Sequence, residues 1–190
     1  IKVLDINGDG VVDLDDRTII GNPNPDYTYG LNVNMNYKQF SLSMLFNGVY
    51  GNDIVNANMY RFGWASRSTF RNILSDAWYN RWTPENTNTS YPRIGYDSEL
   101  LPALMDNTIE DGSYLRLKNI SLGYNLDVDS INFIDSATLS VTGINLFTWT
   151  NYSGYDPEIT SFLWDGLIQG TDWNNKPNSK TILIGLNVEL

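Results

Sequence analysis

Residues 27–50 read YTYGLNVNMNYKQFSLSMLFNGVY, and this stretch decides the fold. From Tyr27 to Tyr37 every second residue is apolar or aromatic, and the residues between them are Thr, Gly and Asn. The alternation resumes from Phe40 to Phe46. Successive side chains of a strand point to opposite faces, so a period of two predicts strands with one apolar and one polar face. Because almost no residues separate the two runs, the stretch predicts a β-hairpin.

The apolar face of this hairpin has the pattern of a membrane-spanning strand pair. Each run is about 11 residues long, and a tilted strand crosses a bilayer with roughly 9–11 residues. Aromatic residues lie at both ends of the apolar face, as in the two aromatic girdles of a membrane barrel. The polar face has Asn, Ser, Gln, Thr and Gly and hardly a charge. These features favour a transmembrane barrel, and a soluble β-sandwich is the alternative.

Three further runs, at 113–126, 137–149 and 180–190, alternate in the same way. Within the first of them, Leu115 and Leu117 have one parity, whereas Ile120 and the apolar residues after it have the other. A β-bulge near Lys118-Asn119 would place both sets on one face. The sequence therefore predicts an all-β fold with five long antiparallel strands, at about 27–37, 39–50, 113–126, 137–149 and 180–190.

The connections between these strands alternate between short and long. In order they have almost no residues, about 60, about 10 and about 30 residues. Outer-membrane barrels have short periplasmic turns and long extracellular loops, so residues 51–111 and 150–179 are expected on the extracellular side. Five strands cannot close a barrel and would leave two unpaired edges. We therefore expect residues 27–190 to be part of a longer barrel, with 1–26 as a further extracellular loop.

The long stretch 51–111 is rich in aromatic residues and contains one helical pattern. A stripe at helical spacing predicts a short helix, with Ser68 as its N-cap and Thr83-Pro84 ending the segment. The stripe consists of Phe70, Ile73, Leu74, Ala77 and Trp78. The aromatic side chains of this stretch are expected to pack against the loop itself or a partner, and stacking on sugar rings is the alternative.

Residues 5–16 have the spacing of an EF-hand calcium loop. The candidate ligands, at loop positions 1, 3, 5, 7, 9 and 12, are Asp5, Asn7, Asp9, Val11 (through its carbonyl), Asp13 and Asp16. The last position has Asp where Glu is usual, and Gly21 to Pro25 prevents a long helix from following. The sequence predicts a structural Ca²⁺ site, and an Asx/Gly turn with solvated carboxylates is the alternative.

Composition excludes several classes of function. The chain has 12 Lys and Arg against 22 Asp and Glu, and this acidic balance argues against nucleic-acid binding. It has no Cys and no His, so disulfides, zinc–thiolate sites and imidazole-based catalysis are excluded. Asp156 and Glu158 are the remaining candidates for an acid pair, and we interpret them as ordinary loop acids. No enzymatic activity is expected.

Eight motifs, in order along nearly all 190 residues, resemble the C-terminal part of the SusC/RagA family of TonB-linked outer-membrane proteins. They are DINGDGVVD (5–13), DRTIIGNPNP (16–25), YKQFSLS (37–43), NGVYGNDI (47–54), IEDGSYLRLKNISLGY (109–124), GINLFTWT (143–150), GYDPE (154–158) and GLNVEL (185–190). The chain departs from the usual pattern at Leu190, where outer-membrane barrels commonly have Phe.

The resemblance implies a barrel of about 22 strands that holds a plug, with this chain supplying the last strands. It implies energised import of glycans or peptides across the bacterial outer membrane, driven by TonB acting on the plug. It also implies a SusD-like surface lipoprotein over the loops 51–111 and 152–179, which become candidate lid or substrate surfaces. The alternative function, from the residues alone, is a secreted calcium-stabilised β-sandwich that binds carbohydrate.

Overall fold

The structure is a computed structural model that describes residues 4–63, 72–94, 105–131, 133–158, 161 and 168–190. Its elements in chain order are η1 (Leu14–Asp16), β1 (Tyr27–Tyr37), β2 (Phe40–Tyr50), β3 (Asp53–Asn56), α1 (Ala57–Gly63), α2 (Ser75–Tyr79), η2 (Asp106–Thr108), β4 (Ile109–Asp111), β5 (Tyr114–Leu126), β6 (Ser136–Thr150), β7 (Thr171–Asp172) and β8 (Thr181–Glu189). The contacts divide the chain into two units. The sheet unit comprises 25–52, 112–157 and 176–190, and the loop unit comprises 1–24, 53–111 and 158–175.

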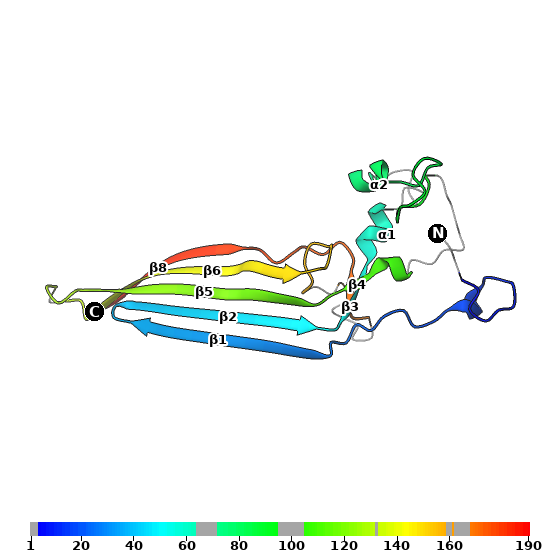
Figure 1. Ribbon diagram of the computed structural model, residues 1–190. Helices are drawn as coiled ribbons and strands as arrows, with labels where there is room; N and C mark the ends of the chain where they lie inside the picture. Colours follow the sequence, from blue (N-terminus) through cyan, green and yellow to red (C-terminus); the bar gives the residue numbers. More distant parts are fainter. Residues whose placement is uncertain (1–3, 64–71, 95–104, 132, 159–160, 162–167) are drawn as a thin grey trace. The chain divides into compact units, whose positions relative to one another are not determined.

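The sheet unit is one five-stranded sheet in the order β1-β2-β5-β6-β8 (Figure 1). Every neighbouring pair is antiparallel, so the predicted antiparallel sheet is confirmed. The hairpin pairs Tyr27 with Tyr50 and Tyr37 with Phe40. Its two-residue turn places Lys38 at a φ of 52°, which closes the hairpin without a longer loop. The five strands begin and end within one residue of the expected ranges.

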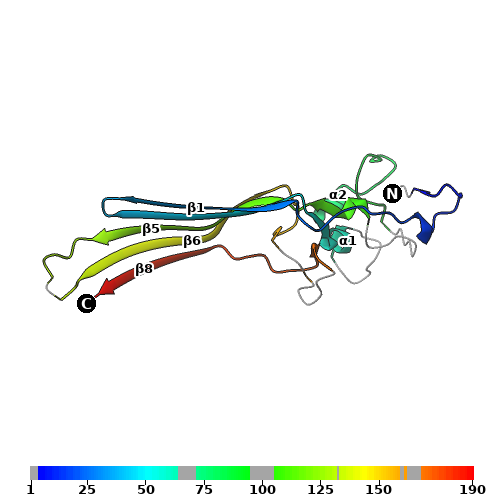
Figure 2. The same ribbon diagram turned by 90° about the horizontal axis from the view of Figure 1, so that it is seen from below.

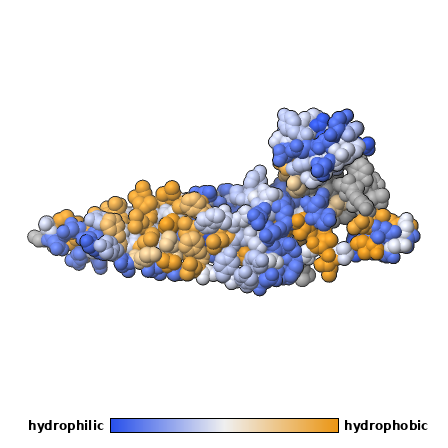
Figure 3. Space-filling model, viewed as in Figure 1, coloured by the Kyte–Doolittle hydropathy of each residue, from blue (hydrophilic) through white to orange (hydrophobic). Residues whose placement is uncertain are grey.

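The register places all the apolar sets on one face of this sheet. Val33, Met44 and Ile120 lie opposite one another across three strands, and Leu42, Leu122, Val141 and Ile184 lie side by side across four. Figure 3 shows apolar residues gathered over the middle of the strands, with less hydrophobic residues toward both strand ends. The described residues of the sheet unit form no second sheet that could cover this face. The arrangement is therefore a single sheet with an open apolar face, and not a sandwich.

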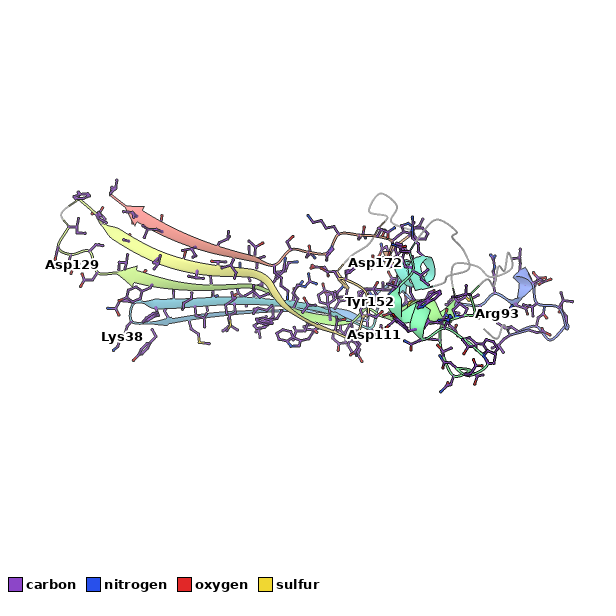
Figure 4. All side chains as sticks on the ribbon, turned by 90° about the horizontal axis from the view of Figure 1, so that it is seen from above. Lys38, Arg93, Asp111, Asp129, Tyr152 and Asp172 are labelled. Atoms are coloured by element: carbon purple, nitrogen blue, oxygen red, sulfur yellow. The ribbon has the colours of Figure 1, made fainter. Side chains whose placement is uncertain are left out.

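The predicted bulge in β5 is confirmed, and β6 has a second irregularity beside it. Met44, Ile120 and Gly143 form one row of paired residues across the three strands, and Phe46, Leu117 and Phe147 form another. Between these two rows β2 spans two residues, β5 three and β6 four. Lys118 is the extra residue in β5. In β6 the chain passes through Asn145 with a φ of 53°. Extra residues in one strand bend it and increase its twist, and Figure 4 shows the bend of β6.

The loop unit contains a small sheet in the order β4-β3-β7. β3 pairs with β4 antiparallel and with β7 in parallel, so the stretches 53–111 and 158–175 share one sheet. The N-terminal segment is bonded to this sheet through Asn22. The Asp53 N–H donates to the Asn22 carbonyl at 2.8 Å, and the Asn22 N–H donates to the Asp53 carboxylate at 2.7 Å. Figure 2 shows the ribbon from below, with α1 and α2 of the loop unit labelled. The strands of this sheet have two to four residues, too few for a period of two to reveal them.

The helices differ from the one that the sequence predicted. Two of its residues, Ser68 and Phe70, lie outside the described residues. The described α2 begins at Ser75, because Leu74 has extended backbone and donates its N–H to the carbonyl of Phe62. The predicted helix is therefore wrong in its inclusion of Ile73 and Leu74. An additional helix, α1, is capped by the Asn56 side chain, which accepts the Met59 N–H at 3.1 Å.

Candidate functional site

The sheet unit leaves many apolar side chains of its strands exposed. Ile184 of β8 has 77% of its surface exposed and Met35 of β1 has 53%. Soluble monomers rarely leave a contiguous apolar surface of this kind in water. A membrane interior would remove it from water, since hydrocarbon is a favourable environment for these side chains. No helix among the described residues is long and apolar enough to cross a membrane.

Aromatic side chains lie at both ends of the apolar face. At one end the rings of Tyr27 and Tyr50 stack with centroids 5.0 Å apart. At the turn end Phe40 and Tyr124 have centroids 4.8 Å apart. Figure 4 places the turns with Lys38 and Asp129 at the same end of the sheet. The two groups of rings match the positions expected of interfacial girdles, whose amphipathic rings suit the boundary between lipid and water.

The opposite face is polar but nearly uncharged. Most of its side chains are Asn, Ser and Thr, and several of them hydrogen bond to one another, such as Ser121 with Thr142 at 2.8 Å and Thr138 with Asn125 at 2.9 Å. The register also places Leu45, Ile144 and Leu183 on this face. The charged residues within the five strands are Arg116 and Glu189 on this face and Lys118 at the bulge. Such a face can donate and accept hydrogen bonds without selecting a ligand by the sign of its charge.

Arg116 forms a buried ion pair with Asp156 on this polar face. The Nη2–Oδ1 distance is 2.5 Å, and the two side chains are 2% and 4% exposed. The second carboxylate oxygen of Asp156 accepts the backbone N–H of Asn178 at 2.9 Å. Sequence reasoning treated Asp156 as an ordinary loop acid and did not anticipate this pair. The pairing engages both of its oxygens and so gives no support to an acid–base role.

The Asp-rich loop is organised by hydrogen bonds from its own backbone. Asp5 accepts the N–H groups of Gly8 and Gly10 at 2.6 and 2.8 Å. Asp16 accepts those of Ile6 at 2.7 Å and Asp13 at 2.9 Å. Among the described residues, no three acidic side chains lie close enough together to hold a metal ion. The loop thus has oxygen ligands of the type that Ca²⁺ prefers.

Backbone hydrogen bonds lower the pKa of the Asp16 carboxyl, with that from Asp13 contributing most and that from Ile6 next. A carboxyl with a lowered pKa stabilises the folded loop above the ordinary pKa of about 3.9, and this contribution is lost as the pH falls through the lower, folded value. We expect the amide proton resonance of Ile6 to titrate with a midpoint below pH 3.9. A midpoint at or above that value in NMR spectra would contradict this arrangement.

Calcium binding by this loop stays a prediction, with Asp5, Asn7, Asp9, Val11, Asp13 and Asp16 as the expected ligands. Millimolar CaCl₂ is expected to slow hydrogen exchange in residues 5–16, because the ion would draw the carboxylates together. Asp9→Asn should weaken the effect, since it removes one anionic ligand. Glu189→Gln, far from the loop in sequence, is the matched control for lost charge. Exchange that does not respond to Ca²⁺ would favour the Asx/Gly turn.

Exposed aromatic residues in the loop unit lie beside arginines. The Arg81 guanidinium lies 4.5 Å from the centroid of the Trp78 ring, and that of Arg61 lies 5.4 Å from Trp173. Trp78 and Tyr79 are exposed, whereas Ala77 on the same helix is buried. α2 therefore packs through its small residue and presents its rings outward, which leaves them available to a partner or ligand.

The chain has relatives of known class over nearly its whole length. It is 37% identical, over 98% of its residues, to the TonB-dependent receptor P26 of Formosa agariphila, and 34% identical, over 97%, to the TonB-dependent receptor P3 of that organism. It is 28% identical, over 98%, to the TonB-dependent receptor SusC of Bacteroides thetaiotaomicron. The alignments cover 17–19% of these proteins, so the chain spans about a fifth of their length. No protein-family model matches the chain.

Solved structures match the fold as well. The structure of the RagAB peptide transporter matches 94% of this chain with a TM-score of 0.78 and 27% sequence identity, over 19% of the matched chain. The RagAB peptide importer in its closed-closed state matches 95% with a TM-score of 0.74 and 26% identity, over 20% of that chain. The two-faced sheet and these matches define the chain as a segment of a transmembrane antiparallel β-barrel. It is homologous to part of the SusC/RagA family of TonB-dependent receptors, so the resemblance drawn from its motifs is confirmed.

Proposed function

We propose that this chain is the C-terminal barrel segment of a SusC-like TonB-dependent importer in the outer membrane of a Gram-negative bacterium. The proposal rests on one combined observation. Nearly all of this chain aligns with part of a TonB-dependent receptor, and its sheet has an exposed apolar face with aromatic rings at the ends. The remaining strands, the plug and the TonB-binding segment would be supplied by the rest of the longer protein. Lipid would cover the apolar face.

The imported substrate in this proposal is a glycan or a peptide. The solved relatives are a peptide transporter and importer, and the nearly neutral polar face of the sheet would hydrogen bond to either class. A SusD-like surface lipoprotein would cover the loops within 51–111 and 150–179. The exposed rings of Trp78 and Trp173 support this part of the proposal, since aromatic residues are enriched at protein interfaces and stack on sugars.

The proposal is tested on the complete protein, tagged and purified in detergent from its native membrane. Mass spectrometry of the denatured preparation should find these residues in one large chain with a plug, together with a lipoprotein partner. Uptake of labelled glycans and peptides should require TonB. A lone 21.6 kDa species that is soluble without detergent would contradict the transporter proposal and favour the carbohydrate-binding alternative.

A further inference from the structure

Arg61 is a half-buried cation of the loop unit. It lies in the last turn of α1, where its guanidinium carbon is 5.4 Å from the centroid of the Trp173 ring and 5.8 Å from that of the Phe62 ring. Within the described part of the chain its buried Nε atom has no hydrogen-bond partner, and no carboxylate forms an ion pair with it. A charge that is partly removed from water is costly unless an acceptor compensates it.

Asn58 adds a second donor on the same side of α1. It lies three residues before Arg61, so the two side chains are neighbours on the helix surface. The Asn58 side-chain oxygen accepts the N–H of Asn174 at 2.9 Å, which leaves the Nδ2 group as its remaining donor. That Nδ2 atom is buried, and no described residue accepts a hydrogen bond from it. This side of α1 therefore presents donors without matching acceptors.

The chain around Trp173 is fixed in place. β7 ends at Asp172, which lies beside α1 in Figure 4, and Trp173 follows it. The Ser161 hydroxyl oxygen accepts the N–H of Trp173 at 2.6 Å and the side-chain amide of Asn175 at 2.9 Å. Trp173 nevertheless remains 39% exposed. An exposed ring on a fixed backbone is a preorganised surface on which the ring of a ligand can stack.

The surplus of donors indicates the chemistry of the ligand. A sugar hydroxyl both donates and accepts, whereas a carboxylate only accepts, through two oxygens that match the fork of a guanidinium. A pyranose ring that bears a carboxylate can place its C–H face on Trp173 while its oxygens bind Arg61. In a peptide the carboxylate is not attached to a rigid ring. The donors and the indole together therefore favour an acidic sugar.

We propose that Asn58, Arg61 and Trp173 form a binding site for a carboxylate-bearing sugar of an acidic glycan. The inference rests on the proposed import function and makes its substrate a glycan that contains uronate. Arg61 binds the carboxylate, Asn58 donates to an oxygen of the same sugar, and Trp173 stacks on the ring. In the proposed barrel these residues belong to long extracellular loops, which a substrate meets before it enters the lumen.

The test measures binding to the complete protein in detergent by isothermal titration calorimetry. The probes are the trisaccharides of galacturonate, glucuronate and mannuronate, the methyl ester of each, and triglutamate. We expect at least one uronate to bind at least tenfold more tightly than its ester, with an affinity that falls as salt is added. Equal affinities for uronate and ester, or binding of no uronate, would overturn the proposal. Triglutamate that binds as tightly as the best uronate would overturn the assignment to a sugar.

Arg61→Met separates a binding role from a structural one, because it retains a long apolar side chain but removes the charge and the donors. The variant should bind the uronate at least tenfold more weakly and no longer distinguish it from the ester. Arg81→Met is the matched control, since Arg81 also lies beside a tryptophan of the loop unit and donates to the Trp78 carbonyl. It removes the same charge and should leave binding unchanged. An Arg61→Met protein that still prefers the uronate to the ester would overturn the site.

Trp173→Ala tests the stacking contact. It should weaken the binding of uronate and ester alike by several-fold, because contact with the ring does not depend on the charge. Unchanged affinities would overturn the role of Trp173. The proposed import function fails separately from the site. Uronate binding that depends on Arg61, without any TonB-dependent uptake of glycans or peptides, would overturn import and leave the binding site in place.

Discussion

Arginine at position 33 is expected to destabilise the folded barrel by about 2–4 kcal/mol, because it places a charge at the middle of the lipid-facing surface. Val33 lies between the aromatic ends of β1, opposite Met44 on β2. An arginine there must either enter hydrocarbon or distort the bilayer to reach water. Val33→Arg should therefore lower the amount of assembled protein in the outer membrane and the urea midpoint of the barrel in lipid vesicles.

Asn34→Arg is the matched control for this variant. Asn34 is the next residue of the same strand and lies on the polar face, where its amide donates to Asn32 at 3.3 Å. The two variants place the same side chain at nearly the same depth and differ only in the face that carries it. We expect Asn34→Arg to change the free energy of unfolding by less than about 1 kcal/mol. Equal effects of Val33→Arg and Asn34→Arg would contradict the assignment of the odd-numbered face of β1 to lipid.

Gly48→Ala is expected to cost about 1–3 kcal/mol, because there is no room for a methyl group at this position. A Cβ on Gly48 would lie 2.3 Å from Cζ of the Tyr29 ring and 2.6 Å from the backbone carbonyl oxygen of Tyr114. The Tyr29 hydroxyl donates to that same carbonyl at 3.1 Å. The ring could move aside, but the backbone oxygen cannot do so without disturbing β5. Heat or urea unfolding of the purified barrel measures the loss.

Gly30→Ala provides the comparison, since Gly30 lies beside Tyr29 in β1 and is not crowded. Its Cβ would meet the Phe46 carbonyl oxygen at 3.6 Å, an ordinary contact. We expect this variant to retain wild-type stability within about 0.5 kcal/mol. The double variant Tyr29→Ala/Gly48→Ala should remain less stable than Tyr29→Ala alone, because the Tyr114 oxygen still opposes the methyl group. Equal stability of Gly48→Ala and Gly30→Ala would show that the contact is not tight.

The long strands could be predicted because each apolar residue of a two-faced strand independently supports a period of two. In β1 alone, six alternate positions from Tyr27 to Tyr37 agree, and the change of parity around Lys118 located a bulge that the register confirms. The small sheet of the loop unit gave no such signal. Its β7 has two residues, Thr171 and Asp172, and depends on pairing with a strand more than 100 residues earlier.

The ion pair was missed for a related reason. Arg116 and Asp156 are 40 residues apart, and nothing in the local sequence of either one indicates the other. A usable signal was nevertheless present, since Arg116 is a charge within a face of Asn, Ser and Thr side chains. An isolated charge on such a face needs a partner once it is buried. The start of α2 was misplaced because Leu74 bonds to Phe62, a contact that helical periodicity cannot reveal.

The bulge at Lys118 also constrains how the length of this strand can vary among relatives. Lys118 is the extra residue that lets Leu117 and Ile120 share the apolar face although their numbers differ in parity. An insertion or deletion of one residue elsewhere in β5 would exchange the two faces of the strand on one side of the change, and so would place polar side chains toward the lipid. Loss of Lys118 itself would leave the faces intact and straighten the strand. Single-residue gaps in alignments of these proteins should therefore collect at Lys118, whereas the loops tolerate longer changes.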